Sequence, residues 1–387
     1  MSENISAPQG APSATPLPIG LQAVERAIAD LRRGATVVVA GNGHALMVQA
    51  AEGVTHDALA RLTALSKGTP SLLLTARRAA ILGLTSDPQG AVRVSLSGGV
   101  TADTVRMMAD PAGPQPQHQP AALSIALIER ETEPGAGELG AIELAKLARL
   151  LPATVVAAVP AERLGYLPSW ADTESLLVVE LDSIHQYRDA EARTLQRVGA
   201  ATVPLSDAEN TNVIAFRPPD GGREHLAIVI GELAPDAPVL VRIHSECFTG
   251  DLLGSLRCDC GDQLRGAVAE INKAGSGVLL YMAQEGRGIG LVNKLRAYEL
   301  QDQGFDTIDA NEQLGFDPDE RIYQPAAEIL RQLSITRVRL LTNNPRKVAA
   351  LADGGIEVVE RVPHAFPANR HSERYLATKQ SRGGHLL

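Results

Sequence analysis

The residues of this chain best suited to metal chemistry are its three cysteines, which lie in one polar segment. Cys247, Cys258 and Cys260 occur within HSECFTGDLLGSLRCDCGDQL, and the 387-residue chain has no other cysteine. Thiolates bind zinc tightly, and a catalytic zinc site uses three protein ligands and keeps its fourth position for water. The spacing Cys-x10-Cys-x-Cys therefore predicts a zinc ion that activates water for hydrolysis.

Other interpretations of these thiols remain open from their spacing alone. Cys258 and Cys260 could form a redox pair, and the third thiol could pack as a small buried hydrophobic side chain. His244 could complete a structural site of four ligands. Against that alternative, His244 lies only three residues before Cys247, and the segment has no second CxxC knuckle.

Two further segments offer donors for a phosphate-bearing ligand. In EGRGIG (285–290), glycines between a predicted strand and a predicted helix let the backbone approach a ligand. Arg287 in this segment provides a forked donor for phosphate, and Arg242 places a second guanidinium directly before the cysteine segment. A glycine-rich turn of this kind is also common for packing reasons, so the pattern alone is weak.

Two segments nearer the C-terminus could complete such a site. TNNPRK (342–347) begins a helix with hydroxyl and ammonium donors, although an Asn cap before a proline-initiated helix explains it equally well. In DPDER (317–321), Asp319 and Arg321 flank one residue, so both side chains can point to one side of an extended turn. That pair suits an acid–base carboxylate and a phosphate ligand or nucleophile, and a charged surface turn is the alternative.

Composition limits the function classes. A net charge of −9 argues against general nucleic-acid binding, and no apolar run approaches the about 20 residues that span a bilayer. Residues 1–20 are rich in Ser, Ala, Pro and Gly and lack the features of a secretory signal, so we expect a disordered leader. Three thiols without a disulfide-like distribution favour a cytoplasmic protein.

The order of predicted elements indicates two domains of α/β (α+β) class. Helical spacing at 21–33 and 140–151 alternates with strand candidates at 35–40 and after residue 153, and no aromatic residue precedes Tyr166. We expect a first domain at 21–206, and a second at 207–387 that opens with a linker at 207–224. Strands alternating with helices in the second domain predict a largely mixed sheet.

The second domain resembles GTP cyclohydrolase II, the enzyme at the entry to riboflavin synthesis. The resemblance rests on RIHSECFTGDLLGSLRCDCG, QEGRGIGLVNKLRAYELQDQG, DTIDANEQLGFDPDER and VRLLTNNPRK, and it continues to the terminal GHLL. It implies one zinc ion per subunit, magnesium with the triphosphate of GTP, and a homodimer. No partner nucleic acid or membrane is expected.

The resemblance also implies a role for each matching position. Asp319 corresponds to the proton acceptor, Arg321 to the proposed nucleophile, and Tyr298 to a tyrosine near the base. The implied zinc ligands are Cys247, Cys258 and Cys260. The implied GTP contacts are Arg242, Ile243, His244, Ser245, Glu246, Gln263, Glu285, Gly286, Arg287, Thr307, Thr342 and Lys347.

The implied reaction is the hydrolysis of GTP to 2,5-diamino-6-hydroxy-4-(5-phosphoribosylamino)pyrimidine, with release of formate and pyrophosphate. Water activated by zinc attacks C8 of guanine, and a second hydrolysis releases that carbon. In the family picture Arg321 attacks the α-phosphorus and forms a guanylyl intermediate. The alternative is that Arg321 only stabilises phosphoryl charge while water attacks, and the sequence leaves both open.

The first domain resembles dihydroxybutanone phosphate synthase, but with its functional residues replaced. Residues 24–52 match the start of that synthase, whereas its acidic loop is shortened here to AGNGHAL (40–46). A second synthase motif aligns with Gly135 onward, where Gly137 replaces its histidine, and a glutamate expected later falls at Ala158. The rearrangement needs a metal held by carboxylate and imidazole, so we expect no synthase activity.

Two other functions remain as alternatives to a GTP cyclohydrolase. A nucleobase deaminase is suggested by His244-x-Glu246 near thiols, although that signature requires a following PCxxC and this chain has Cys-Asp-Cys. A regulator that binds GTP without turnover is the other alternative, and the presence of Cys247, Asp319 and Arg321 argues against it.

Overall fold

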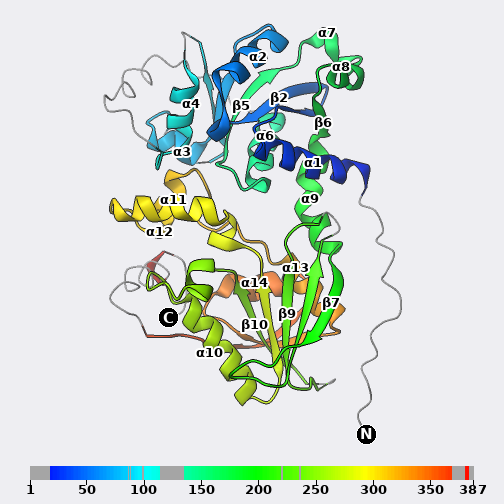
Figure 1. Cartoon of the computed structure of the whole chain (residues 1–387), viewed down its shortest axis with the longest axis vertical. Helices are drawn as coiled ribbons and strands as arrows, with labels where there is room; N and C mark the ends of the chain where they lie inside the picture. Colours follow the sequence, from blue (N-terminus) through cyan, green and yellow to red (C-terminus); the bar gives the residue numbers. More distant parts are fainter. Residues whose placement is uncertain are drawn as a thin grey trace.

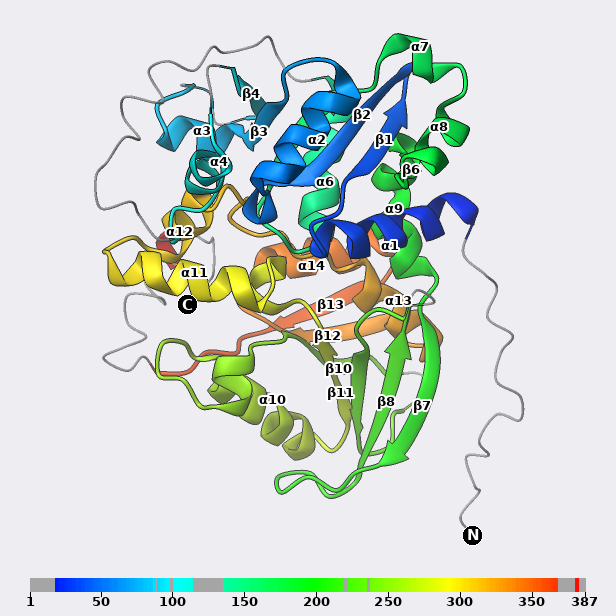
Figure 2. The same ribbon diagram turned by 45° about the horizontal axis from the view of Figure 1, so that its top comes forward.

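The structure is a computed structural model that describes residues 18–85, 87, 89–97, 100–113, 135–218, 221–234, 237–367 and 380–382. Most of the expected leader and the terminal GHLL lie outside these residues. The described chain forms two α/β domains, each with its own sheet, which confirms the predicted fold class. Figures 1 and 2 show the domains stacked, with helices α11 (Leu291–Asp302) and α12 (Thr307–Gln313) between them.

The sheet of the first domain has the strand order β4-β3-β5-β2-β1-β6. Among the strands that the structure describes in this sheet, only β1 and β6 pair in parallel. β1 and β2 form a hairpin through Asn42 and Gly43, whose φ angles of 53° and 76° suit a tight two-residue turn. The strands are β1 (Val37–Gly41), β2 (His44–Ala50), β3 (Ser71–Thr75), β4 (Ala91–Ser95), β5 (Ala153–Ala158) and β6 (Leu177–Glu180).

Helices cover both faces of this sheet because its central strands are apolar on both sides. Val37 and Val39 pack in one core with α1, α6 and α9, while Val38 packs in the core on the other face. The helices of the domain are α1 (Ile19–Arg32), η1 (Ala51–Gly53), α2 (His56–Ser66), α3 (Ala76–Ile81), α4 (Ala102–Ala109), α6 (Ala136–Leu147), α7 (Ala161–Leu164), α8 (Leu167–Thr173) and α9 (Leu181–Arg193).

The second domain has a seven-stranded mixed sheet of order β13-β12-β10-β11-β9-β8-β7. Strands β11, β10, β12 and β13 are parallel, and β7, β8 and β9 continue the sheet antiparallel. The strands are β7 (Gln196–Thr202), β8 (Thr211–Arg217), β9 (His225–Ile230), β10 (Val239–Ser245), β11 (Gly277–Met282), β12 (Arg337–Leu341) and β13 (Glu357–Val362).

The segment expected to link the domains is instead part of this sheet. β8 lies within 207–224 and pairs with both β7 and β9, so the linker prediction was wrong. β7 precedes residue 207, which means that the second sheet begins before the expected boundary. The polar residues around TNVIAFR suggested a linker, but Ile214 and Phe216 alternate into the core as a paired strand requires.

The two faces of the second sheet carry different helices. Leu240 and Leu279 face α10, whereas Val241 and Leu280 face α13 and α14. The helices are η2 (Phe248–Leu252), α10 (Cys260–Lys273), η3 (Glu285–Gly288), α11, α12, α13 (Gln324–Gln332) and α14 (Pro345–Asp353). No helix among the described residues is both long and apolar enough to cross a bilayer.

The domains share a hydrophobic core. Ala297 and Leu300 of α11, with Leu314 and Phe316 after α12, belong to the same buried cluster as the first-domain strands. The first domain therefore packs directly on the elements that follow β11, at the carboxyl ends of the parallel strands of the second sheet.

Candidate active site

A deep cleft opens at the carboxyl ends of the parallel strands β10, β11 and β12. Ser245 ends β10, η3 follows β11, and Thr342 follows β12, so three consecutive segments converge there. Ligands of open α/β sheets bind at such strand ends. The cleft is open to solvent, and residues of all three segments line it.

Nearly all of the predicted site residues line this one cleft. The exceptions are Ile243, whose side chain is buried in the core, and Asp319, which lies behind Arg321. The predicted residues in the lining are Arg242, His244, Ser245, Glu246, Cys247, Cys258, Cys260, Gln263, Glu285, Gly286, Arg287, Tyr298, Thr307, Arg321, Thr342 and Lys347.

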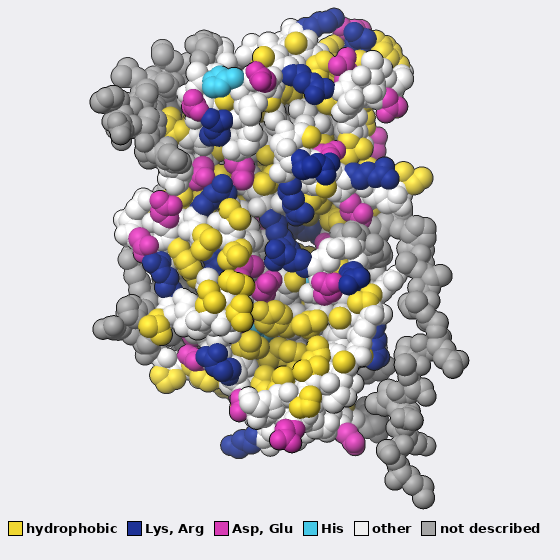
Figure 3. All heavy atoms as spheres, viewed as in Figure 1, with side chains coloured by type: hydrophobic (Ala, Val, Ile, Leu, Met, Phe, Trp, Pro, Cys, Tyr) yellow, Lys and Arg dark blue, Asp and Glu magenta, His cyan; other side chains and the backbone are white. Residues whose placement is uncertain are grey.

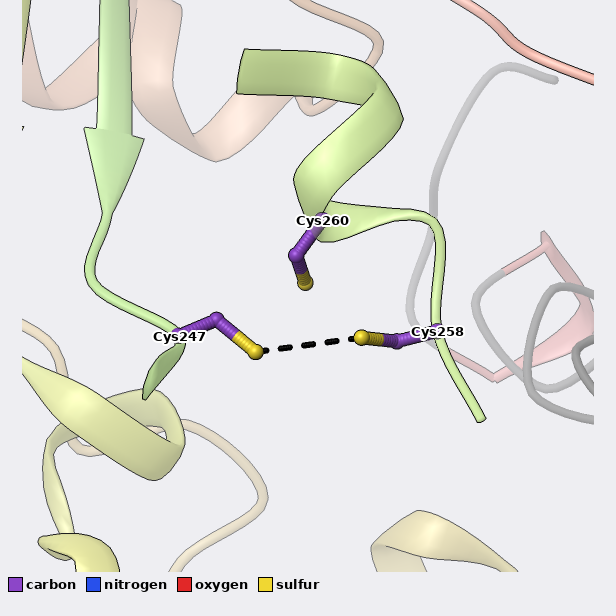
Figure 4. A group of neighbouring side chains, drawn as sticks. All are labelled: Cys247, Cys258 and Cys260. Carbon is purple, nitrogen blue, oxygen red and sulfur yellow. Dashed lines mark hydrogen bonds between the residues drawn. The ribbon is translucent and has the colours of Figure 1, made fainter. Parts of the chain in front are cut away.

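The three thiols meet at one end of the cleft. Figure 4 shows Cys247, Cys258 and Cys260 pointing toward a common centre, and their sulfurs all lie within 4.8 Å of one another. The Cys247 and Cys258 sulfurs are 3.7 Å apart, far beyond a disulfide bond. Two sulfurs bound to one tetrahedral zinc lie about 3.8 Å apart, because each bond is about 2.3 Å long. The arrangement therefore fits a three-thiolate zinc site.

Gly250 in η2 makes room for this convergence. A Cβ atom there would lie 2.9 Å from Cys258 Sγ, 2.9 Å from Cys260 Cβ and 3.0 Å from Cys247 Sγ. Such distances are too short for non-bonded carbon and sulfur. The loop between the first and second cysteine thus needs glycine where it passes under the thiols.

Lys294 of α11 supplies positive charge beside the thiols. Its Nζ donates to Cys247 Sγ at 3.1 Å, Thr249 Oγ1 at 3.0 Å and Glu285 Oε1 at 2.8 Å. Burial alone would lower the pKa of Lys294, but the Cys247 charge and the Glu285 hydrogen bond raise it above its usual value. A permanent cation here offsets part of the charge of a thiolate cluster.

His244 is not placed to complete a four-ligand metal site. Its Nε2 lies 3.0 Å from Asp251 Oδ1, and among the described residues the only metal-like cluster contains the cysteines alone. Burial lowers the pKa of His244, which keeps the ring neutral. Asp251 also accepts from the Cys247 backbone N–H at 2.9 Å and from Tyr281 Oη at 3.0 Å, so it anchors the start of the cysteine loop.

Asp319 and Arg321 form a bidentate pair at the cleft wall. Arg321 donates from Nε to Oδ1 at 2.7 Å and from Nη2 to Oδ2 at 2.6 Å. Burial would raise the pKa of Asp319, but Arg321 and the charge of Arg287 lower it below its usual value, so the carboxylate is ionised. Nη1 of Arg321 lies 3.4 Å from Ser245 Oγ, on the cleft side of the pair.

Other cationic side chains surround this end of the cleft. Arg242 is buried and donates to the Leu341 carbonyl at 2.9 Å and to Gln263, while burial lowers its pKa to about 10. Lys347 at the start of α14 donates to the Ile243 carbonyl at 2.7 Å. Ile243 thus contributes through its backbone. With Arg287 and Arg321, these groups give the cleft a positive end suited to phosphates.

Tyr298 of α11 lines the same cleft as the thiols. Its Oη lies 3.3 Å from Thr249 Oγ1, and the Lys294 and Arg257 cations lie 5.6 Å and 5.0 Å from its ring centre. Burial raises the pKa of its phenol above the usual value. Glu246, the residue before Cys247, is half-buried, and burial raises the pKa of its carboxyl despite the charge of Arg223.

Sequence reasoning missed several residues of the site. Lys294, Asp251 and His364 were not singled out, although Lys294 precedes Tyr298 by four residues and so shares its helix face. His364 is buried and bonds the Gln263 carbonyl through Nε2 at 2.9 Å. No spacing rule links it to the site, because it lies beyond β13.

Comparisons with known proteins agree with this geometry. The sequence model of the family GTP cyclohydrolase II matches residues 196–363, which begin at the first residue of β7. The GTP cyclohydrolase-2 of Azospirillum brasilense is 55% identical over 370 residues, covering 95% of this chain and 94% of that protein. The riboflavin biosynthesis protein RibBA of Bacillus cereus (strain ATCC 14579) is 46% identical over 252 residues, covering 64% and 63%.

One solved structure extends over most of the chain. RibBX from A. baumannii, a two-domain 3,4-dihydroxy-2-butanone 4-phosphate synthase, is 19% identical and covers 89% of this chain and 99% of its own, with a TM-score of 0.34.

Proposed function

Because this chain belongs to the GTP cyclohydrolase II family, we propose that its cleft hydrolyses GTP to 2,5-diamino-6-hydroxy-4-(5-phosphoribosylamino)pyrimidine, formate and pyrophosphate, the first step of riboflavin biosynthesis. The observation that carries the proposal is that one cleft is lined by three converging thiols, with Lys294 beside them, and by the cationic groups of Arg242, Arg287, Arg321 and Lys347. GTP offers a guanine ring for the first set of groups and a triphosphate for the second.

The thiol end would act on the guanine ring. Cys247, Cys258 and Cys260 would hold zinc, which when bound supplies the Lewis acidity that makes water nucleophilic near neutral pH. Lys294 holds the Cys247 thiolate and Glu285 in place. Tyr298 would contact the base and, with the apolar wall of Ile289 and Ala297, keep bulk water from C8.

The cationic end would act on the triphosphate. Arg287, Lys347 and Arg242 would bind the phosphates, with magnesium neutralising part of their charge. In the covalent route, a guanidine nitrogen of Arg321 bonds to the α-phosphorus, the bond to pyrophosphate breaks, and the N–H proton passes to Asp319. The ionised state of Asp319 supports its role as proton acceptor. In the alternative route Arg321 only stabilises the developing charge while water attacks.

One experiment distinguishes this function from the two alternatives, a GTP-binding regulator and a deaminase. Incubation with GTP, zinc and magnesium, followed by product identification, should yield formate, pyrophosphate and the diaminopyrimidine. Unchanged GTP would support a GTP-binding regulator. Release of ammonia would support a deaminase, which the Asp251 contact of His244 disfavours because zinc deaminases use a histidine or cysteine in that position as a ligand.

We also propose that the first domain has no synthase activity. The segment that would carry acidic metal ligands is here the tight turn at Asn42 and Gly43 between β1 and β2. Glu138 is not available as a ligand, because it pairs with Arg93 and caps α6 through the Gly135 backbone N–H. In the described parts of the first domain, no cluster of carboxylate and histidine groups could hold a metal ion. Ribulose 5-phosphate should therefore remain unchanged at any magnesium concentration.

The remaining expectations concern assembly and location. We propose a cytoplasmic homodimer with no nucleic-acid or membrane partner. Figure 3 shows hydrophobic side chains gathered on one face of the second domain. η2, the segment after it and α11 expose large apolar side chains that a second copy could cover, and light scattering would measure the assembly. These side chains are Phe248, Leu252, Leu253, Leu256, Val292 and Leu295.

A further inference from the structure

The loop that carries Asp319 and Arg321 is held from behind by the first domain. We call residues 315–321 the Asp319 loop. Lys146 of α6 donates to Asp317 Oδ2 at 3.0 Å and lies 2.6 Å from Glu320 Oε1. Its side chain is only 17% exposed and that of Glu320 only 11%, so this pair is shielded from water. An ion pair held in this way is more ordered than an exposed one.

Two further first-domain contacts fix the same loop. Arg77 of α3 bonds Asp317 Oδ1 at 3.0 Å, and the Thr75 hydroxyl donates to the Gly315 carbonyl at 2.8 Å. Burial would raise the pKa of Asp317, but the charges and hydrogen bonds of Lys146 and Arg77 lower it, so its carboxylate stays ionised. Side chains of the first domain thus make polar contacts along the length of the loop.

Glu320 transmits this restraint to the catalytic pair, because Asp319 and Arg321 are its neighbours in the chain. Its carboxylate also accepts from the Asp317 backbone N–H at 3.0 Å, and its own N–H donates to the Arg287 carbonyl at 3.0 Å. At Gly288 a Cβ atom would lie 2.9 Å from the Glu320 carbonyl, so the loop rests directly on η3. The loop is clamped between η3 and Lys146.

Not all contacts between the domains reach this loop. Arg296 of α11 pairs with Asp110 at 3.0 Å and Glu52 at 3.3 Å, and Asn293 bonds the Arg149 carbonyl at 3.0 Å. These contacts dock α11 against the first domain without touching residues 315–321. Substitutions at these contacts therefore serve as controls, because they weaken the contact between the domains without altering residues 315–321.

We propose that Lys146 of the first domain is a positioning residue for the GTP chemistry of the second domain. By holding Asp317 and Glu320, it keeps Asp319 and Arg321 in the geometry that the cleft requires. The proposal rests on the proposed function of the cleft. On this proposal the first domain, which we expect to lack synthase activity, contributes to the turnover of GTP in the second domain.

The test compares Lys146→Met with wild type in the full-length protein. A displacement of the pair by about 1 Å costs up to about 100-fold in rate, so kcat should fall about 10- to 100-fold while KM for GTP stays within about threefold. Zinc content should not change. Lys146→Arg should recover most of the activity, and Glu320→Gln, which removes the charge but keeps a hydrogen-bond acceptor, should lower kcat as Lys146→Met does.

Asp110→Asn is the matched control, because it breaks an ion pair between the domains away from the loop. Its kcat should stay within about twofold of wild type. An equal loss in Asp110→Asn and Lys146→Met would overturn the proposal in favour of general domain docking. A wild-type kcat in a folded Lys146→Met protein would overturn it as well.

Hydrogen exchange separates this proposal from the proposed function. In Lys146→Met, the backbone amides of 315–321 should exchange at least about tenfold faster, whether or not GTP is turned over. Unchanged exchange in that segment would refute positioning by Lys146. A wild-type protein that leaves GTP intact would instead refute the proposed function.

Discussion

Replacing Gly250 with alanine should disable the metal site without removing any ligand. The added Cβ would lie 2.9–3.0 Å from atoms of all three cysteines, and ordinary contact would require them to move by about 0.5–1 Å. Zinc–thiolate distances tolerate only about 0.2 Å. The φ angle of Gly250 is not left-handed, so alanine adds no backbone strain. The three nearest atoms that the added Cβ would meet all belong to the cysteines.

We expect zinc affinity to fall about 100-fold or more, equivalent to about 3 kcal/mol. Competition with a chromogenic chelator measures the affinity, and formate release should fall in parallel at limiting zinc. Gly199→Ala is the control, because a Cβ at Gly199 in β7 meets no atom within 4 Å. A Gly250→Ala protein with the zinc affinity of wild type would refute the assignment of the three thiols to one ion.

Three further predictions follow from the same geometry. Cys258→Ser should lose stoichiometric zinc and formate release, because a neutral hydroxyl cannot replace a thiolate; metal analysis that finds full zinc would contradict this. Arg321→Lys should keep its zinc but lose turnover by at least about 100-fold, since an ammonium cannot make the paired bonds to Asp319; a direct assay of pyrophosphate tests it. The third concerns His225, whose pKa is lowered to about 4 by burial and by the charge of Arg149, while its Nδ1 accepts from the Ala283 backbone N–H. The buried neutral ring stabilises the fold fully above about pH 6.5, and this contribution is lost as the pH falls toward about 4. Between pH 7 and pH 5 the free energy of unfolding should therefore drop by about 2 kcal/mol more in wild type than in His225→Asn. Equal slopes in urea titrations of the two proteins would rule this out.

The sequence predicted the chemistry of the site best where the residues concerned are close together in the chain. Cys258 and Cys260 are two residues apart, and Asp319 and Arg321 flank a single residue, so local geometry already brings their side chains together. The glycines after β11 were by themselves a weaker indication, because such turns are also common for packing reasons. The family resemblance extended these local patterns to one cleft, and the GTP cyclohydrolase II identification is confirmed.

Prediction from local sequence patterns was wrong where hydrogen bonding between strands determined the structure. The segment around β8 reads as a polar linker, yet hydrogen bonds from β7 and β9 on either side make it an inner strand. Composition cannot reveal this, because strand pairing depends on partners as much as on the strand itself.

The sequence by itself determined the ligand types, their local spacing and the family. Only the tertiary structure decided what surrounds them: that Lys294 donates to the Cys247 sulfur, that Gly250 makes room for the thiols, and that Lys146 reaches Asp317 across 171 positions of the chain. The physical reason is that spacing constrains side chains within a few residues of each other. Contacts between distant segments are set by the packing of two sheets and the helices between them.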